Sequence, residues 1–95
     1  MTTYKLRFHP LAWREWQQLD ASVREPLKKK LAERLQSPRV PASALHGMAD
    51  CYKIKLHSVG YRMIYGVDDD EIFITVIATG KRDRNKAYRT AQNRL

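Results

Sequence analysis

The chain has 95 residues, of which 43% are hydrophobic and 29% charged. These values are typical of one folded domain over residues 1–95 and exclude a disordered chain. The net charge of +8 indicates a polyanionic partner such as RNA or DNA, although it could serve solubility alone.

The first residues predict a strand and a helix. Apolar and basic side chains alternate over Tyr4–Phe8, the period-2 pattern of a half-buried strand. Pro10 ends this strand and suits the first turn of a helix that reaches about Leu19. Trp13 and Trp16 recur at helical spacing, so we expect both in the core.

A second helix is predicted from the capping-box pattern Ser22–Glu25 to about Gln36. Its apolar residues fall four apart and form one stripe that should face the core: Val23, Leu27, Leu31 and Leu35. Its consecutive lysines cover most of the remaining surface: Lys28, Lys29 and Lys30. Such a run is usually solvated, though it could also contact a nucleic acid.

From Cys51 onward the pattern predicts β-structure. One strand alternates apolar and basic residues, turns at Ser58–Gly60 and returns through Val67. The apolar run Ile72–Ala78 predicts a central strand buried on both faces. Asp83 can cap a short last helix. We therefore expect an α+β fold: a small antiparallel sheet of about four strands, two N-terminal helices packed on one face and a short C-terminal helix.

Strand parity gathers basic residues on one face of this sheet. If Tyr52, Ile54 and Leu56 point inward, Lys53, Lys55 and His57 share the opposite face. By the same rule Arg62 on the return strand joins them. Lys81 and Arg82 follow the central strand, and Tyr88 on the last helix could reach this face or simply pack against the sheet.

The basic and phenolic composition of this set limits its chemistry. The chain has one cysteine, so we expect no disulfide within it. Its three histidines lack paired spacing, and the candidate set contains no paired carboxylates, so we expect no metal and no other cofactor. Such cations can bind phosphate and stabilise developing negative charge. Because RNA supplies its own 2′-hydroxyl nucleophile, a catalytic site of this kind would select RNA.

Several segments together resemble the bacterial RelE toxin family. They are Cys51–Leu56, Gly60–Tyr65 and Gly80–Arg84, with Ser22–Leu31 and Ser37–Arg39 before them. The resemblance covers nearly the whole chain. It implies a microbial RNase-like fold and a metal-independent endoribonuclease that cleaves mRNA in the ribosomal A site through attack of the 2′-hydroxyl.

The resemblance also implies roles and partners. Lys53 and Lys55 match the family's lysines at the scissile phosphate, and Arg62 matches the arginine that stabilises the transition state. Arg82 matches the candidate general acid and Tyr88 the candidate general base. The implied partners are the ribosome, mRNA, a RelB-like antitoxin and, through the antitoxin complex alone, operator DNA.

Lys81, His46 and the lysines Lys28, Lys29 and Lys30 are further candidates for contact with RNA or the ribosome. His46 departs from the family pattern, which tends to have arginine there, so it could be an inert loop residue or a weaker contact. No apolar run approaches the roughly 20 residues of a membrane helix, and no segment resembles a signal peptide, so we expect a cytoplasmic protein.

Two other functions remain open on the sequence. A toxin of the same superfamily could act on a topoisomerase without cleaving RNA, but it would not need the joint presence of the basic and phenolic set. A non-catalytic nucleic-acid-binding regulator would bind without producing new RNA ends.

Overall fold

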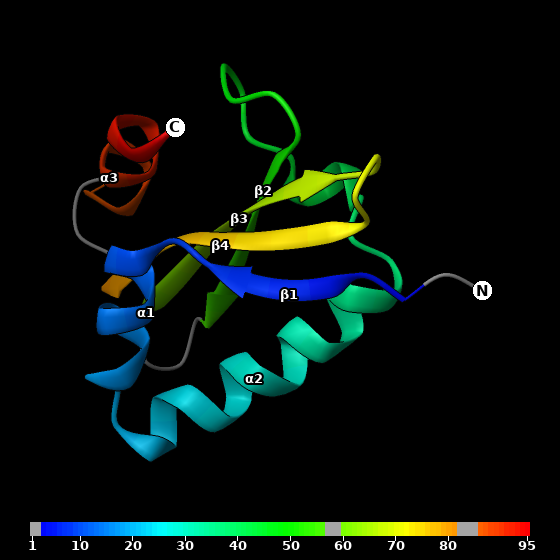
Figure 1. Ribbon diagram of the computed structural model, residues 1–95. Helices are drawn as coiled ribbons and strands as arrows, with labels where there is room; N and C mark the ends of the chain where they lie inside the picture. Colours follow the sequence, from blue (N-terminus) through cyan, green and yellow to red (C-terminus); the bar gives the residue numbers. More distant parts are fainter. Residues whose placement is uncertain (1–2, 57–59, 82–85) are drawn as a thin grey trace.

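The computed structural model describes residues 3–56, 60–81 and 86–95, and Figure 1 shows the arrangement of its elements. In chain order these are β1 (Lys5–Phe8), α1 (Pro10–Gln17), α2 (Ala21–Gln36), the short 3-10 helix η1 (Pro41–Ser43), β2 (Cys51–Leu56), β3 (Tyr61–Asp68), β4 (Phe73–Lys81) and α3 (Lys86–Arg94). The strands form one sheet in the order β1-β4-β3-β2, with helices on both faces. The predicted α+β class is confirmed.

The direction of the first strand corrects the prediction of a wholly antiparallel sheet. β2 pairs with β3, and β3 with β4, in antiparallel fashion. β1 instead runs parallel to β4, with Lys5 opposite Phe73. The sheet is therefore mixed. A hairpin fixes the direction of consecutive strands, but β1 and β4 are far apart in sequence, so local patterns cannot reveal how they pair.

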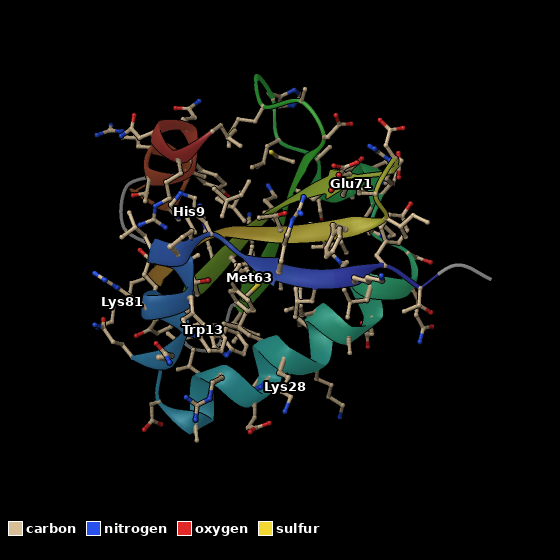
Figure 2. All side chains as sticks on the ribbon, in the orientation of Figure 1. His9, Trp13, Lys28, Met63, Glu71 and Lys81 are labelled. Carbon is tan, nitrogen blue, oxygen red and sulfur yellow. The ribbon has the colours of Figure 1, made fainter. Side chains whose placement is uncertain are left out.

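One face of the sheet carries α1 and α2 and the larger part of the core. The predicted leucine stripe is confirmed, because Val23, Leu27 and Leu31 of α2 are buried. They belong to one cluster with Ile54 and Met63 of the sheet, and Figure 2 shows Met63 between the sheet and α2. Burying each such side chain stabilises the fold by roughly 1.5–3 kcal/mol.

Two local expectations on this face were wrong. α2 is capped by Asp20, whose carboxylate accepts a hydrogen bond from the Ser22 amide at 3.1 Å, so Ser22 is not the cap. Hydrogen bonds from Ser22 also hold the pKa of Asp20 below its usual value. Trp13 is 46% exposed, whereas Trp16 is partly buried against the core. Trp13 instead packs edge-on against Phe8, with ring centroids 5.2 Å apart.

The opposite face carries α3 and the segment of residues 44–50 (Figure 1). A second, smaller cluster lies here and includes Ala87 and Ala91 of α3, together with Ile64 and Ala78 of the sheet. The small side chains let the helix approach the strands closely. Within the described ranges, no helix is both long enough and apolar enough to cross a membrane.

A β-bulge in β4 turns two consecutive side chains toward this second face. Ile64 is opposite Ala78 and Tyr65 is opposite Val76, so Ile77 is an extra residue in the ladder. An extra residue reverses the alternation of side chains beyond it. Ile77 and Ala78 consequently both belong to the cluster under α3.

Candidate active site

Strand parity places the predicted basic residues together. Tyr52, Ile54 and Leu56 belong to the core on the α2 side of the sheet, as expected. The intervening Lys53 and Lys55 therefore face the α3 side. Arg62 joins them, because the register of β2 and β3 pairs it directly with Lys55. His57, expected on the same face, lies outside the described residues.

The segment of residues 44–50 forms one wall beside these cations. It folds back along β2 through a bridge between Ala44 and Tyr52 and a hydrogen bond from the Leu45 amide to the Cys51 carbonyl at 3.0 Å. Gly47 has φ of +77°, a conformation that favours glycine and turns the segment tightly. Met48 is buried beneath it. The backbone thus brings His46 to the rim of the site.

α3 forms the opposite wall and contributes the predicted phenol. The guanidinium carbon of Arg62 lies 5.1 Å from the ring centroid of Tyr88, a cation–π contact. Tyr88 therefore faces the site and also packs its ring, so the two readings of this residue are compatible.

These two walls border an open hollow of about 610 Å³. Five predicted residues line it: His46, Lys53, Lys55, Arg62 and Tyr88. The convergence that the sequence predicts for Lys53, Lys55 and Arg62, with Tyr88 within reach, is thus present, and His46 joins them without having been placed there by strand parity. Arg82 and the predicted cap Asp83 lie outside the described residues.

Arg62 is the buried member of the cationic group. The residue is only 9% exposed, and its Nε atom has no hydrogen-bond partner among the described residues. A buried donor without a partner costs roughly 1–3 kcal/mol, and the neighbouring Lys53 and Lys55 repel the guanidinium. A bound anion would relieve both costs. The hollow is therefore suited to a phosphate.

The other predicted contact residues lie elsewhere. Lys81 is exposed and lines a different hollow of about 290 Å³, with Glu15 and Thr79. Lys28, Lys29 and Lys30 are exposed on α2, on the other side of the sheet from the hollow. Figure 2 shows Lys28 on α2 and Lys81 at the opposite edge of the molecule from the N-terminus. These side chains could contact a large partner but not one nucleotide held in the hollow.

Four residues that line the hollow were missed from the sequence: Leu45, Met48, Arg89 and Gln92. Helical spacing could have predicted two of them, Arg89 and Gln92. Gln92 is four residues after Tyr88 and three after Arg89, so a helix that turns Tyr88 to the site turns these with it. No sequence signal shows that residues 44–50 fold back along β2.

The side chains around the hollow offer cations, a phenol and an imidazole. Among the residues that the structure describes, no group of three or more His, Cys, Asp or Glu side chains is placed to hold a metal ion. The arrangement can bind a phosphodiester, neutralise added negative charge and exchange a proton through Tyr88 or His46.

Comparisons with known proteins identify the family of this chain. A family model described as the ParE toxin of type II toxin–antitoxin systems matches residues 6–86. The mRNA interferase toxin RelE of Escherichia coli is 51% identical over 92 residues, which cover 97% of each protein.

Two solved structures are similar over most of the chain. A mutant E. coli RelE toxin in the free state has a TM-score of 0.90 at 48% identity and 98% coverage of both chains. The toxin of the intact E. coli RelBE toxin–antitoxin complex has a TM-score of 0.83 at 53% identity, covering 85% of this chain and 99% of that one. The chain therefore belongs to the RelE family of toxins of type II toxin–antitoxin systems.

Proposed function

We propose that the protein is a metal-independent endoribonuclease that cleaves mRNA in the ribosomal A site and so stops translation. The observation that carries the proposal is the convergence of Lys53, Lys55, Arg62 and Tyr88 on one hollow. The E. coli relative at 51% identity is named an mRNA interferase toxin, which supports cleavage of mRNA as the activity.

The proposed reaction uses the 2′-hydroxyl of the substrate as nucleophile. Tyr88 acts as general base and removes the hydroxyl proton, and the 2′-oxygen forms a new bond to phosphorus. The bond from phosphorus to the 5′-oxygen breaks, and Arg82 donates a proton to the leaving oxygen. The products are a 2′,3′-cyclic phosphate, or the 3′-phosphate formed from it, and a 5′-hydroxyl end.

The cations stabilise the charge that develops in this step. Lys53 and Lys55 bind the scissile phosphate from β2. Arg62 is largely buried, so its side chain is held in place. Its Nε lacks a partner among the described residues, so this donor can bind the additional negative charge of the transition state. Donors held in place before the reaction stabilise a transition state without the cost of reorganisation.

An open hollow on a small protein gives little means of orienting a flexible RNA by itself. We propose that the ribosome supplies this orientation, with His46 contacting RNA at the rim of the hollow and Lys81 contacting RNA outside it. Lys28, Lys29 and Lys30 would contact ribosomal RNA from the opposite side. The proposed location is the cytoplasm, where translation takes place.

We further propose that a RelB-like antitoxin neutralises the protein and that operator DNA is bound only through their complex. The support is the solved toxin–antitoxin complex of the E. coli relative, which is 53% identical to this chain. An acidic partner would also complement the net charge of +8.

The activity is tested by primer extension on ribosomes programmed with a defined mRNA. We expect new 5′-hydroxyl ends within the A-site codon, and a 2′,3′-cyclic phosphate or 3′-phosphate at the 3′ end of the upstream fragment. A single 2′-deoxynucleotide at the scissile position should abolish cleavage there, because it removes the nucleophile. Cleavage of the deoxy-substituted message at the same bond would refute the 2′-hydroxyl mechanism.

Arg62→Gln tests the localised site under single-turnover conditions with saturating ribosomes. Loss of one preorganised cation should lower the rate by about 100-fold or more. Lys28→Gln removes the same charge from the outer surface of α2 and is the matched control, with a rate near that of the wild type. Equal losses in the two variants would contradict a catalytic role for the hollow.

The two other candidate functions predict different outcomes. A toxin directed at a topoisomerase leaves the message intact and inhibits DNA supercoiling, and a simple regulator binds without new RNA ends. The comparisons favour neither, because the relatives at 51% identity are named mRNA interferases.

A further inference from the structure

α3 has few apolar contacts for an element that forms a wall of the hollow. It has nine residues, and helices this short are unstable in isolation. Among its described residues the buried side chains are Ala87 and Ala91, which bury little area, and Tyr88 is only partly buried. It also carries Arg89 toward the cations Lys53 and Arg62, which repel it.

Arg94, the last residue of α3, makes a bidentate ion pair that offsets these weaknesses. Its Nη1 and Nη2 atoms donate to the two carboxylate oxygens of Glu15 at 2.8 and 2.9 Å. The Arg94 side chain is only 12% exposed and that of Glu15 31%. Shielding from solvent makes such a pair stronger than an ordinary surface salt bridge.

The ion pair is tied to the backbone of β4 as well as to α1. Arg94 Nη1 also donates to the carbonyl oxygen of Ile77 at 2.8 Å. Ile77 is the extra residue of the bulge, and such a residue is left unpaired in the ladder. Glu15 in turn accepts a hydrogen bond from the Thr79 amide at 3.1 Å. The bulge thus supplies an attachment point for the helix.

We propose that Glu15 and Arg94 are positioning residues of the active site, whose ion pair holds α3 against β4 and keeps Tyr88 over Arg62. Arg94 lies six residues after Tyr88, about 9 Å along a helix axis, so it acts through the helix without touching the substrate. The kinetic consequence of this inference rests on the proposed ribonuclease function. The structural consequence does not.

Amide hydrogen exchange followed by mass spectrometry tests the structural consequence. In Arg94→Gln, amides of α3 should exchange about tenfold faster or more, as expected when a shielded ion pair is broken, while β3 and the centre of β4 stay protected. Arg7→Gln is the matched control, because Arg7 pairs with Asp68 and Glu71 at 3.9 and 3.6 Å, away from α3. Unchanged exchange in α3 would overturn the inference.

The conservative variant Arg94→Lys separates charge from general damage to the helix. A lysine can still pair with Glu15 but cannot form the bidentate contact, so its exchange should lie between the wild type and Arg94→Gln. If Arg94→Lys were no better than Arg94→Gln, the ion pair would not be what holds α3. Circular dichroism confirms that each variant is folded before exchange is measured.

A double-mutant cycle on programmed ribosomes tests the link to Tyr88. Arg94→Gln should lower the single-turnover rate about tenfold at saturating ribosomes. In a Tyr88→Ala background the same change should cost about twofold or less, because the side chain that it positions is already absent. Equal losses in both backgrounds would show a merely structural role and would overturn the proposal.

These outcomes separate the inference from the proposed function. If the wild type cleaves no message, the ribonuclease proposal fails, but the exchange experiment still decides whether the ion pair holds α3. If the wild type cleaves and the cycle is additive, the ribonuclease proposal stands and the positioning role is refuted.

Discussion

Burial changes the chemistry of Cys51, the single thiol of the chain. The residue is 3% exposed and lies in the cluster beneath α3 and the segment of residues 44–50. Burial raises the pKa of its thiol, and the nearby charge of Asp50 raises it further. The thiolate is the reactive form of cysteine, so the fold suppresses both its formation and its accessibility. Cys51 is a core residue rather than a nucleophile.

We therefore expect Cys51 to resist alkylation in the native protein. With iodoacetamide at pH 8, modification should be about 100-fold slower than in 6 M guanidinium chloride, where the thiol is exposed and its pKa returns to the ordinary value. Mass spectrometry of timed samples measures both rates. A native rate within a few-fold of the denatured rate would mean that the segment over Cys51 opens readily.

Arg62 shows what parity in the sequence can predict at the scale of single residues. Alternation along β2 and β3 correctly assigns Lys53, Lys55 and Arg62 to the face opposite the main core, because the side-chain period of a strand is fixed by backbone geometry. The burial of Arg62 could not be predicted in the same way. It depends on Tyr88 and α3, which approach from a distant part of the sequence.

At the scale of elements, Tyr65 joins β3 to α2 and to the segment that follows it. Its hydroxyl donates to the carbonyl oxygen of Pro38 at 2.6 Å and accepts from Arg34 Nη1 at 2.8 Å. Arg34 also donates to the carbonyl oxygen of Lys53, on the same strand as the site lysines. This partly buried network links α2 to β2 and β3.

Tyr65→Phe should lower the free energy of unfolding by about 1–3 kcal/mol, because the Pro38 carbonyl and Arg34 each lose a buried partner. Urea denaturation at pH 7 measures the change. Tyr52→Phe is the control: its hydroxyl accepts one bond, from Arg39 at 3.2 Å, and it should cost less than about 1 kcal/mol. Similar losses in both variants would indicate that the network contributes little beyond ring packing.

The same variant should change the response to alkaline pH. Burial raises the pKa of Tyr65 above the ordinary value of 10.0, although the hydrogen bond from Arg34 opposes the shift. The folded state therefore holds its proton more tightly than the unfolded state, and this contribution to stability is lost as pH rises above about 10. Tyr65→Phe should lose less stability than the wild type between about pH 10 and 11.

The elements themselves follow closely from local patterns, whereas their relations do not. The apolar run Ile72–Ala78 correctly predicts a central strand, since β4 lies between β1 and β3. The bulge at Ile77 leaves no mark in that run, because an extra apolar residue does not interrupt it. Because the bulge cannot be recognised in the sequence, the hydrogen bond from Arg94 to the Ile77 carbonyl oxygen could not be predicted either.

At the scale of the whole molecule, two groups of cations lie on different surfaces. The hollow on the α3 side contains Lys53, Lys55, Arg62 and Arg89. Lys28, Lys29 and Lys30 are exposed on α2, on the other side of the sheet. A polyanion that contacts both surfaces must extend around the protein, which a short free RNA cannot do. Binding and catalysis should therefore respond to different charges.

The combined variant Lys28→Gln, Lys29→Gln and Lys30→Gln tests this division. Its maximal single-turnover rate on ribosomes should stay within about twofold of the wild type, since the hollow is intact. The ribosome concentration for half-maximal rate should rise about tenfold near physiological salt, and its dependence on the logarithm of salt concentration should weaken by a slope of about 2, as three phosphate contacts are lost.

Arg62→Gln should show the opposite pattern, with a large loss of maximal rate and a small change in the half-maximal concentration. Rates measured over a series of ribosome and monovalent salt concentrations, at constant magnesium, give both quantities. If the triple variant had the half-maximal concentration and salt slope of the wild type, the lysines of α2 would face solvent in the complex. The ribosome would then contact the α3 side of the sheet alone.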